Sequence, residues 1–554
     1  MSSNTRPKSV FTLDVYPDAP IAEVSPLIYS GFIEHLGRCI YGGILPARDT
    51  DWPHTARNPC PSEKFVATPP ELVSPEGFRV DVLNCIRDEL RVPMIRWPGG
   101  NYVATYHWLD GVGPQAERRK RPDLAWGGEE PNSFGTDEFI QWCRAAKCEP
   151  YLCFNMGTGT LDEALNWVEY CNGTGDTCYA SLRRKNTGRE EPHNVKYWGI
   201  GNEVWGPWIV RQQSAQEYAA TCRQWAHALK LIDPNIVLVS CGKTGLDEWD
   251  NVILRNVCDK VQLHSVHLYT SFGPRDRSSK LSEYNRAVYG PAAAEHSIEI
   301  ARRIIDKACV EHVARTSNEP SIVPAENIVP KVRIAFDEWG VWDESIGTPQ
   351  NGLEQPYDLK DGLAFGAWLN VFIRQASTVT LACLAQSVNV ISPLVVRPKG
   401  ILRHPTYHVL RLYSNFMRDG ISVPVHIGGS APVYAGDTLP VWTSLARGAQ
   451  NVLDASAVLC PSAEGRKSLR IAVVNRDLEA AFEHVPIRIA FRDVLPATVQ
   501  VYEVWHDDAF ARNGWGEEGG PMQDNVVTKT WSEQWTGVYT FKPHSFTLLV
   551  VEVA

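Results

Sequence analysis

The sequence predicts a (β/α)8 barrel, an α/β fold, followed by an antiparallel, jelly-roll-like β-sandwich. From about residue 24 to 395, eight short and nearly all-apolar runs alternate with helical periods, as in parallel strands covered on both faces. After about residue 415 the strand-like runs lie close together, and Gly, Pro and Asp separate them, as in a sandwich. An open doubly wound sheet is the competing architecture for the first part. It usually carries a Gly-rich phosphate loop after its first strand, where this chain has Glu34–Arg38.

The barrel strands are predicted where apolar runs end in polar residues. They are Ile28–Ile33, Met94–Trp97, Tyr151–Asn155, Val195–Ile200, Ile236–Ser240, Ser265–Leu268, Val332–Phe336 and Thr380–Ala385. Within 214–232, apolar residues recur at spacings of three and four, which indicates one face of a helix. Further helices are predicted from Thr136, as the N-cap, and over Glu295–Val313 and Leu359–Gln375.

The sandwich is predicted from six closely spaced runs with polar breaks. They are Leu439–Leu445, Leu469–Val474, Val485–Phe491, Thr498–Trp505, Val526–Trp531 and Ser545–Val553. The N-terminal run Val10–Val15 is also strand-like and lies outside the barrel count, so we expect it to join the sandwich. The predicted domains are therefore an N-terminal segment 1–23 that packs with the sandwich, a catalytic barrel 24–400 and a sandwich 401–554.

Composition limits the classes of partner. The chain has 554 residues and a net charge of −10, which disfavours nucleic acid and anionic membrane surfaces and fits a neutral substrate. Nineteen Trp and nineteen Tyr suit the stacking of sugar rings, although large cores also hold aromatics. No apolar run is long enough to span a membrane and the first residues do not resemble a secretion signal, so we expect a cytoplasmic protein.

Cysteine and histidine patterns argue against metal and cofactor chemistry. The fourteen Cys show no Cys-x-x-Cys and read as reduced residues, although Cys171 and Cys178 flank a loop and could bridge in an exported protein. His264 and His267 are three apart on a predicted strand, so they point to opposite faces and cannot chelate together. We therefore predict no metal and no cofactor.

Two carboxylates follow buried strands and form the most informative pattern in the chain. Glu203 ends Gly201–Glu203 after the fourth predicted strand, and Glu338 lies in Asp337–Trp339 after the seventh. Barrel enzymes place their sites at these strand ends, and a pair of carboxylates is what glycoside hydrolysis requires. A structural ion pair at the strand ends is the alternative.

Other polar residues lie at the carboxyl ends of most of the predicted barrel strands and are expected to converge on one pocket. Arg96 could keep one carboxylate ionised, and Asn202 could bind the sugar hydroxyl beside the reacting carbon. Glu34 could instead pair with Arg38 or His35. The remaining strand-end residues are Asn101, Asn155, His267, Tyr269 and Gln386.

Four segments resemble glycoside hydrolase family 51, the α-L-arabinofuranosidases, and the likeness extends over essentially the whole chain. They are 31–44 (Gly-Phe-Ile-Glu-His-Leu-Gly-Arg-Cys-Ile-Tyr-Gly-Gly-Ile), 96–101 (Arg-Trp-Pro-Gly-Gly-Asn), 336–342 (Phe-Asp-Glu-Trp-Gly-Val-Trp) and 386–391 (Gln-Ser-Val-Asn-Val-Ile). The resemblance implies that Glu203 is the acid/base, Glu338 the nucleophile and His267 a neighbour of the acid/base. It also implies homo-oligomers, often hexamers. It assigns the furanose site to Glu34, Arg96, Asn101, Trp126, Asn202, Tyr269 and Gln386.

These features together predict a retaining exo-acting α-L-arabinofuranosidase that acts on arabinan or arabinoxylan oligosaccharides. Two alternatives keep the mechanism and change the substrate, to β-1,4-glucan or xylan in an open cleft or to a galactofuranoside. A third is a non-catalytic carbohydrate-binding protein. Two connections look unusually long and are expected at the site face: Pro46–Pro70, which contains Trp52, His54 and Cys60, and Gly273–Pro291. Loops at this face decide what fits beside the cleaved sugar, so the leaving-group preference stays open. Ser317–Pro330 is expected at the opposite end.

Overall fold

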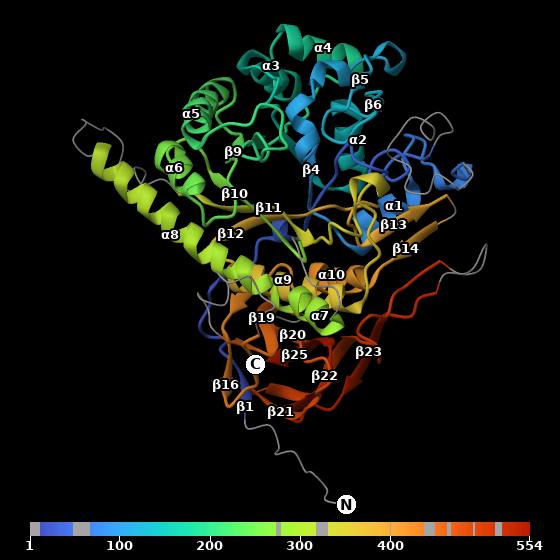
Figure 1. Ribbon diagram of the computed structural model, residues 1–554, viewed down its shortest axis with the longest axis vertical. Coiled ribbons are helices and arrows are strands. Elements are labelled where there is room, and N and C mark those ends of the chain that lie inside the picture. The colour runs from blue at the N-terminus through green and yellow to red at the C-terminus, as the bar shows by residue number, and fades with distance from the viewer. Residues whose placement is uncertain are drawn as a thin grey trace, which may run out of the picture.

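The chain folds into a barrel and a pair of packed sheets, which form the upper and lower halves of Figure 1. This computed structural model describes residues 11–47, 67–272, 279–316, 331–398, 400–436, 449–462, 467–490, 494–515 and 523–553. The predicted strand 439–445 and the predicted segment 317–330 lie outside these residues, as do most of 46–70 and part of 273–291.

Eight strands close into a parallel barrel, as predicted. Around the barrel their order is β10, β11, β12, β3, β4, β7, β8 and β9. Nearly every residue in them is buried, because side chains fill the barrel interior and helices cover its outside. The strands are β3 (Ser30–Phe32), β4 (Met94–Trp97), β7 (Glu149–Cys153), β8 (Tyr197–Ile200), β9 (Val237–Ser240), β10 (Leu263–Thr270), β11 (Arg333–Val341) and β12 (Val379–Leu384).

The helices of the barrel follow its strands along the chain. They are α1 (Val80–Asn84), α2 (Thr136–Ala146), α3 (Leu161–Asn172), α4 (Cys178–Thr187), α5 (Ala215–Ile232), α6 (Glu248–Val257), α7 (Lys280–Tyr289), α8 (Pro291–Thr316), α9 (Leu359–Arg374) and α10 (Pro405–Phe416). α5 begins with a capping box in which Ser214 accepts from the Glu217 amide. Thr136 is wrong as the predicted cap of α2, because Gly135 is the N-cap and Thr136 is the first helical residue.

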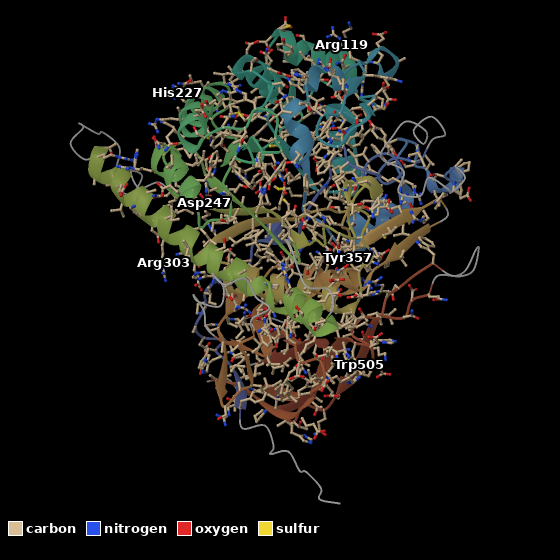
Figure 2. The ribbon with its side chains drawn as sticks, viewed as in Figure 1. Arg119, His227, Asp247, Arg303, Tyr357 and Trp505 are labelled. Carbon is tan, nitrogen blue, oxygen red and sulfur yellow. The ribbon has the colours of Figure 1, made fainter. Side chains whose placement is uncertain are left out.

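Helix α9 joins the two halves of the molecule. Every residue from Leu359 to Ile373 is buried, and the helix contacts β11 of the barrel on one side and β19 and β20 of the sheets on the other. Figure 1 shows α9 and α10 between the barrel and the sheets, and Figure 2 labels Tyr357, just before α9, in this same layer. A helix with no solvent-exposed face must be covered by protein on every side, as the barrel and the sheets cover α9.

The second half is a two-sheet sandwich, as predicted. One sheet has the order β2-β15-β19-β20-β25-β22-β23 and the other β16-β1-β21-β24, and a shared apolar core lies between them. The strands are β1 (Phe11–Val15), β2 (Ala22–Glu23), β15 (Ile421–Val423), β16 (Val425–Gly429), β19 (Leu453–Pro461), β20 (Lys467–Asn475), β21 (Phe482–Ile489), β22 (Val494–Val504), β23 (Thr528–Glu533), β24 (Val538–Phe541) and β25 (Ser545–Val553). Among the described residues, three two-stranded antiparallel sheets lie apart from these: β5–β6 (Arg121–Pro122, Glu129–Glu130), β13–β14 (Leu394–Arg397, Gly400–Arg403) and β17–β18 (Val433–Tyr434, Gln450–Asn451).

The N-terminal strand β1 lies in the sandwich, as expected from the sequence. It pairs antiparallel with β16 but parallel with β21, so the sandwich is not purely antiparallel. The predicted boundary at residue 400 falls within the β13–β14 hairpin, and α10 follows it and packs on α9. We therefore propose that the barrel domain extends through α10, to Phe416.

Strand β11 carries one more residue than its two neighbours, and this detail shapes the site. Against both β10 and β12, β11 advances by three residues while the neighbour advances by two, which is a β-bulge. The registers change from Ser265↔Ala335 to His267↔Glu338 and from Phe336↔Ala382 to Trp339↔Leu384. Asp337 and Glu338 are adjacent in sequence, yet both reach the guanidinium of Arg96 inside the barrel.

The structure also bears on the predicted disulfide alternative and on membrane-spanning helices. Cys171 and Cys178 are both free thiols, the first buried and the second exposed, so the possible bridge between them is absent. Among the described residues, none of the helices combines the length and apolar character needed to cross a bilayer.

Candidate active site

The predicted polar residues converge at the carboxyl ends of the barrel strands. The ten predicted site residues fall into two sets of hydrogen bonds, one centred on Arg96 and Glu338 and the other on Glu34. Asn155, a further strand-end residue, joins neither set: its amide binds the Tyr106 carbonyl, and its side-chain oxygen accepts from the amides of Gly157 and Thr158. The first set holds Arg96, Asn202, Glu203, His267, Tyr269 and Glu338, and the second holds Glu34, Trp126 and Gln386. The tenth, Asn101, is 3.5 Å from the Asn202 amide nitrogen.

Glu338 has a donor on each carboxylate oxygen. Arg96 Nη1 donates to Oε1 at 2.7 Å, and the Tyr269 hydroxyl donates to Oε2 at 2.8 Å. Glu338 is only 5% exposed, so these two contacts compensate the cost of burying its charge. Both donors favour the ionised carboxylate and fix the direction in which it points.

Asn202 and Glu203 follow β8 on a sharply turned backbone. Gly201 has φ +84°, and a Cβ there would lie 2.7 Å from Met156 Cγ, so only glycine suits the position. Glu203 itself has φ +42°, an uncommon conformation for a residue with a side chain, and strain of this kind concentrates at functional sites. Asn202 accepts a hydrogen bond from Arg96 Nη2 at 2.6 Å, so one guanidinium connects both motifs.

Glu203 is held differently from Glu338. Among the described residues its side chain contacts His267, whose Nδ1 lies 3.0 Å from Glu203 Oε1, and the side chain is 13% exposed against 7% for Glu338. No cation of Arg or Lys contacts it among the described residues. Glu203 is therefore the less constrained and more exposed carboxyl of the pair.

His267 lies between carboxylates on both sides. Its Nε2 is 3.2 Å from Asp337 Oδ1, and its Nδ1 is also 3.6 Å from Glu338 Oε2. Burial alone would lower the pKa of His267, but Glu338, Asp337 and Glu203 outweigh it and raise the pKa to about 10. The imidazole is consequently a cation at neutral pH. His264, by contrast, contacts Asp250 of α6 and Ser240, outside the barrel interior.

Glu34 occupies the other wall of the site and pairs with neither residue considered from the sequence. His35 binds Glu130, and Arg38 binds Glu354. Burial raises the pKa of Glu34 to about 8 against the effect of its hydrogen bonds, so a large fraction is uncharged at neutral pH. Its three donors are the Tyr102 amide at 2.9 Å, the Trp126 indole at 2.9 Å and the Gln386 amide at 3.0 Å.

Glycine residues make room for this carboxyl. A Cβ at Gly100 would lie 2.6 Å from Glu34 Oε2, so a larger residue in the turn after β4 would displace Glu34. Trp126 comes from the turn between β5 and β6, where Asp123 Oδ1 accepts the Trp126 amide and holds the turn in shape. The sequence offered no local signal that this indole reaches Glu34, and only the family resemblance suggested it.

Sequence reasoning missed a third carboxylate, Asp337. It is 2% exposed, Tyr151 donates to its Oδ2 at 2.7 Å, and Ser265 donates to Oδ1. Burial opposes its charge, but Arg96, His267 and Ser265 outweigh burial and hold the pKa of Asp337 well below its usual range. Strand alternation places Asp337 opposite to Glu338, and only the bulge in β11 brings both to the interior.

Glu203, His267 and Glu338 lie close enough to act together. One oxygen of each carboxylate and one ring nitrogen of the histidine all lie within 4.8 Å of one another, and they form the one such cluster among the described residues. A protonated imidazole has no lone pair to offer a metal ion, so this donor set does not suit one. The absence of a metal from the reaction stays a prediction.

Comparisons with known proteins identify the family. The family model described as "Alpha-L-arabinofuranosidase 1 domain" matches residues 87–286, and the one described as "Alpha-L-arabinofuranosidase C-terminal domain" matches residues 337–545. The chain is 45% identical to alpha-L-arabinofuranosidase C of Emericella nidulans over 551 residues, 97% of this chain and 96% of the relative. It is 34% identical over 410 residues to an intracellular exo-alpha-(1->5)-L-arabinofuranosidase of Acetivibrio thermocellus, 71% of this chain and 72% of the relative.

A solved structure of the same family also superposes on this chain. The GH51 alpha-L-arabinofuranosidase of Thermotoga petrophila RKU-1 superposes with a TM-score of 0.79 at 35% identity, over 98% of this chain and 100% of that one. The family resemblance noted in the sequence is thus confirmed over the barrel and the sandwich together. The chain belongs to the α-L-arabinofuranosidases of glycoside hydrolase family 51 and is a glycoside hydrolase.

Proposed function

We propose that the protein is a retaining, exo-acting α-L-arabinofuranosidase that releases terminal non-reducing arabinofuranose from arabinan or arabinoxylan oligosaccharides. The observation that carries the proposal is the approach of Glu203 and Glu338, which present oxygens within 4.8 Å of one another. Retaining glycosidases hold their carboxyl groups about 5–5.5 Å apart, and inverting ones need roughly 6.5–9.5 Å to admit a water. The short separation supports double displacement.

The hydrogen bonds assign one role to each carboxyl. Arg96 and Tyr269 donate to both oxygens of Glu338, an arrangement that suits an anionic nucleophile. Glu203 has neither of these donors and is the more exposed of the two, as suits a group that exchanges protons with substrate and water. Glu338 is therefore the nucleophile and Glu203 the acid/base.

The reaction follows in two displacements. Glu338 attacks the anomeric carbon while Glu203 gives its proton to the departing glycosidic oxygen, and a covalent arabinosyl-enzyme forms. Glu203, now ionised, takes a proton from water, which attacks the same carbon and frees Glu338. Asn202, held by Arg96 at 2.6 Å, is placed beside this carbon to bind a neighbouring hydroxyl as positive charge develops.

The wall around Glu34 supports action on a chain end. Glu34 and Gln386 are 2% and 3% exposed, and Trp126 and Tyr102 close over the same carboxyl. Such a wall suits a single terminal sugar better than a polymer that passes through, and the Acetivibrio relative is named as an exo enzyme. We propose Asn101 as a further contact to the furanose.

The test compares rates on matched aryl glycosides. We expect rapid hydrolysis of an aryl α-L-arabinofuranoside, slow hydrolysis of the aryl galactofuranoside and none of soluble cellulose. Faster hydrolysis of galactofuranoside or cellulose would replace the proposed substrate while keeping the mechanism. Binding of arabino-oligosaccharides without turnover would reject the enzyme role.

Relatives and the family resemblance support proposals for localisation and assembly. The Acetivibrio relative is named intracellular, so we propose that this enzyme also acts inside the cell, on short oligosaccharides. We also propose a homo-oligomer, a hexamer by family resemblance. Fractionation of the source cells and light scattering of the purified protein test the two proposals; secreted protein or a monomer would reject the respective one.

A further inference from the structure

Asp337 is a buried carboxylate in the barrel interior with a hydrogen-bond donor on each oxygen, and the mechanism above does not use it. Its carboxylate accepts from Ser265 and His267 on Oδ1 and from Tyr151 on Oδ2, and Arg96 Nε lies 3.7 Å from Oδ2. It is 2% exposed and its oxygens are occupied by these donors. Asp337 is therefore positioned to act on the other site residues and not on the sugar.

His267 transmits the effect of Asp337 to the acid/base. Nδ1 of His267 lies 3.0 Å from Glu203, and Nε2 lies 3.2 Å from Asp337. Ionised carboxylates only accept hydrogen bonds, and a neutral imidazole carries a single N–H. The ring can donate to both partners at once only when both nitrogens carry protons, so the geometry requires an imidazolium whenever Glu203 is ionised.

The charges in the cluster explain why a third carboxylate is needed. Arg96 and His267 contribute two positive charges. In the free enzyme Glu338 and Asp337 balance them while Glu203 holds the acid proton. In the arabinosyl-enzyme Glu338 is an uncharged ester, and ionised Glu203 and Asp337 balance them. The cluster is neutral in both states only if Asp337 is ionised throughout, and a buried net charge is costly.

We propose that Asp337 is a positioning residue that keeps His267 protonated through the catalytic cycle, so that His267 holds Glu203 in place as its charge alternates. The proposal rests on Glu203 being the acid/base, as proposed above. Removing the Asp337 charge leaves Arg96 and His267 with one anion too few. His267 then gives up its proton near neutral pH, and Glu203 loses a partner that stabilises its ionised form in the second displacement.

All groups that face this pair bear on its titration. Those in the site are Glu34, Arg96, Glu203, Tyr269 and Glu338, and those packed around Asp337 are Tyr151, Cys153, Cys241, Ser265 and Cys383. Of these, the thiols of Cys153, Cys241 and Cys383 and the hydroxyls of Tyr151 and Tyr269 have raised pKa values because they are buried, so they stay neutral across the working range. Ionised carboxylates remain as the groups that hold the proton on His267.

The first experiment observes the ring directly. The full enzyme is labelled with ¹⁵N-histidine, and His267 is assigned by the signal that disappears in His267→Gln. We expect wild-type His267 to remain an imidazolium through neutral pH and to titrate near pH 10, while in Asp337→Asn it titrates between about pH 6 and 8. A wild-type ring that titrates near its ordinary value would overturn the proposal without any variant being needed.

The second experiment measures pH profiles of kcat and KM on an aryl arabinofuranoside. Asp337→Asn should lower kcat by about 10- to 100-fold, leave KM within about threefold, and add an ionisation between pH 6 and 8. The matched control is Asp250→Asn, since Asp250 pairs with His264 at 3.0 Å on the same strand but outside the site. It should lower the melting temperature and leave the pH profile unchanged. The same profile for both variants would reduce Asp337 to a structural residue.

These outcomes separate the present proposal from the proposed function. The NMR titration reports on the free enzyme and does not depend on which carboxyl is the nucleophile. If Glu338→Gln retained full activity, the proposed function would fail while the titration could still stand. An unchanged His267 signal in a folded Asp337→Asn variant would overturn the present proposal and leave the assignment of Glu338 intact.

Discussion

Arg96 Nη1 donates to Glu338 Oε1 at 2.7 Å, across a barrel in which β12 and β3 separate their two strands. Both side chains are almost fully buried, at 1% and 7% exposure. A buried ion pair of this kind contributes little net stability, because desolvation offsets attraction, but removal of one partner is strongly unfavourable. The pair is better understood as orienting a nucleophile than as holding the barrel together.

Tyr269→Phe removes the second donor to Glu338 and keeps the ring. A hydrogen bond to a charged group contributes about 1.5–3 kcal/mol, so we expect kcat to fall roughly 10- to 150-fold with a smaller change in KM. Steady-state kinetics on an aryl arabinofuranoside measures this. Tyr357→Phe is the control, since Tyr357 is buried and donates only to backbone carbonyls; it should lower stability and leave kcat nearly unchanged. Equal losses in both variants would contradict the role of Tyr269.

Glu203→Gln should discriminate between leaving groups. An activated aryl group departs without a proton, whereas an oligosaccharide needs one. We therefore expect kcat/KM to fall about 10²- to 10⁴-fold on arabino-oligosaccharides and much less on an aryl glycoside with a good leaving group. Equal losses on the two substrates would show that Glu203 does not protonate the leaving oxygen.

Trp126→Phe tests the wall around Glu34. The substitution keeps an aromatic ring and removes the indole N–H that lies 2.9 Å from Glu34 Oε1. We expect kcat/KM to fall about tenfold, mostly through KM, because the sugar-binding carboxyl loses a donor that positions it. Trp108→Phe is the matched control, since its indole donates to the Glu163 backbone away from the site. A larger kinetic effect at Trp108 than at Trp126 would refute this reading.

Glu34→Gln should change how stability depends on pH. Burial raises the pKa of Glu34 from 4.5 to about 8, so the native state favours the neutral form. Its contribution is fully present below about pH 4.5 and is lost as pH rises through about 8, a change on the order of a few kcal/mol. Denaturant unfolding of both proteins should show Glu34→Gln gaining stability relative to wild type over that window. A constant difference across pH would mean that Glu34 is not protonated in the fold.

Part of this site could be predicted from the sequence because parallel barrels place strand ends together. Once the strands are counted, polar residues at the ends of apolar runs, such as Arg96 and Gln386, are expected at one end of the barrel. Asp337 could not be predicted, since regular alternation sends it away from Glu338 and nothing in the local sequence marks a bulge in β11. The contact of Trp126 with Glu34 depends on the shape of a distant turn, which local patterns do not encode.

For the fold, the positions of the barrel strands could be predicted, but their ends and the pairing of β1 could not. Apolar runs located all eight barrel strands, but β10 and β11 extend past their predicted ends, so that Tyr269 and Glu338 lie within strands and bind one another there. The parallel pairing of β1 with β21 was not predictable, since it joins segments more than 400 residues apart and the strand pattern carries no direction.

The most direct test of the central claim is to trap the arabinosyl-enzyme. In Glu203→Gln an activated aryl arabinofuranoside can still form the first intermediate, but the base for its hydrolysis is missing, so the intermediate should accumulate. Intact-mass spectrometry should then show the protein heavier by one anhydro-pentose residue, and peptide mapping should place it on Glu338. A pentose bound elsewhere, or turnover that releases the inverted sugar with no adduct, would contradict the account.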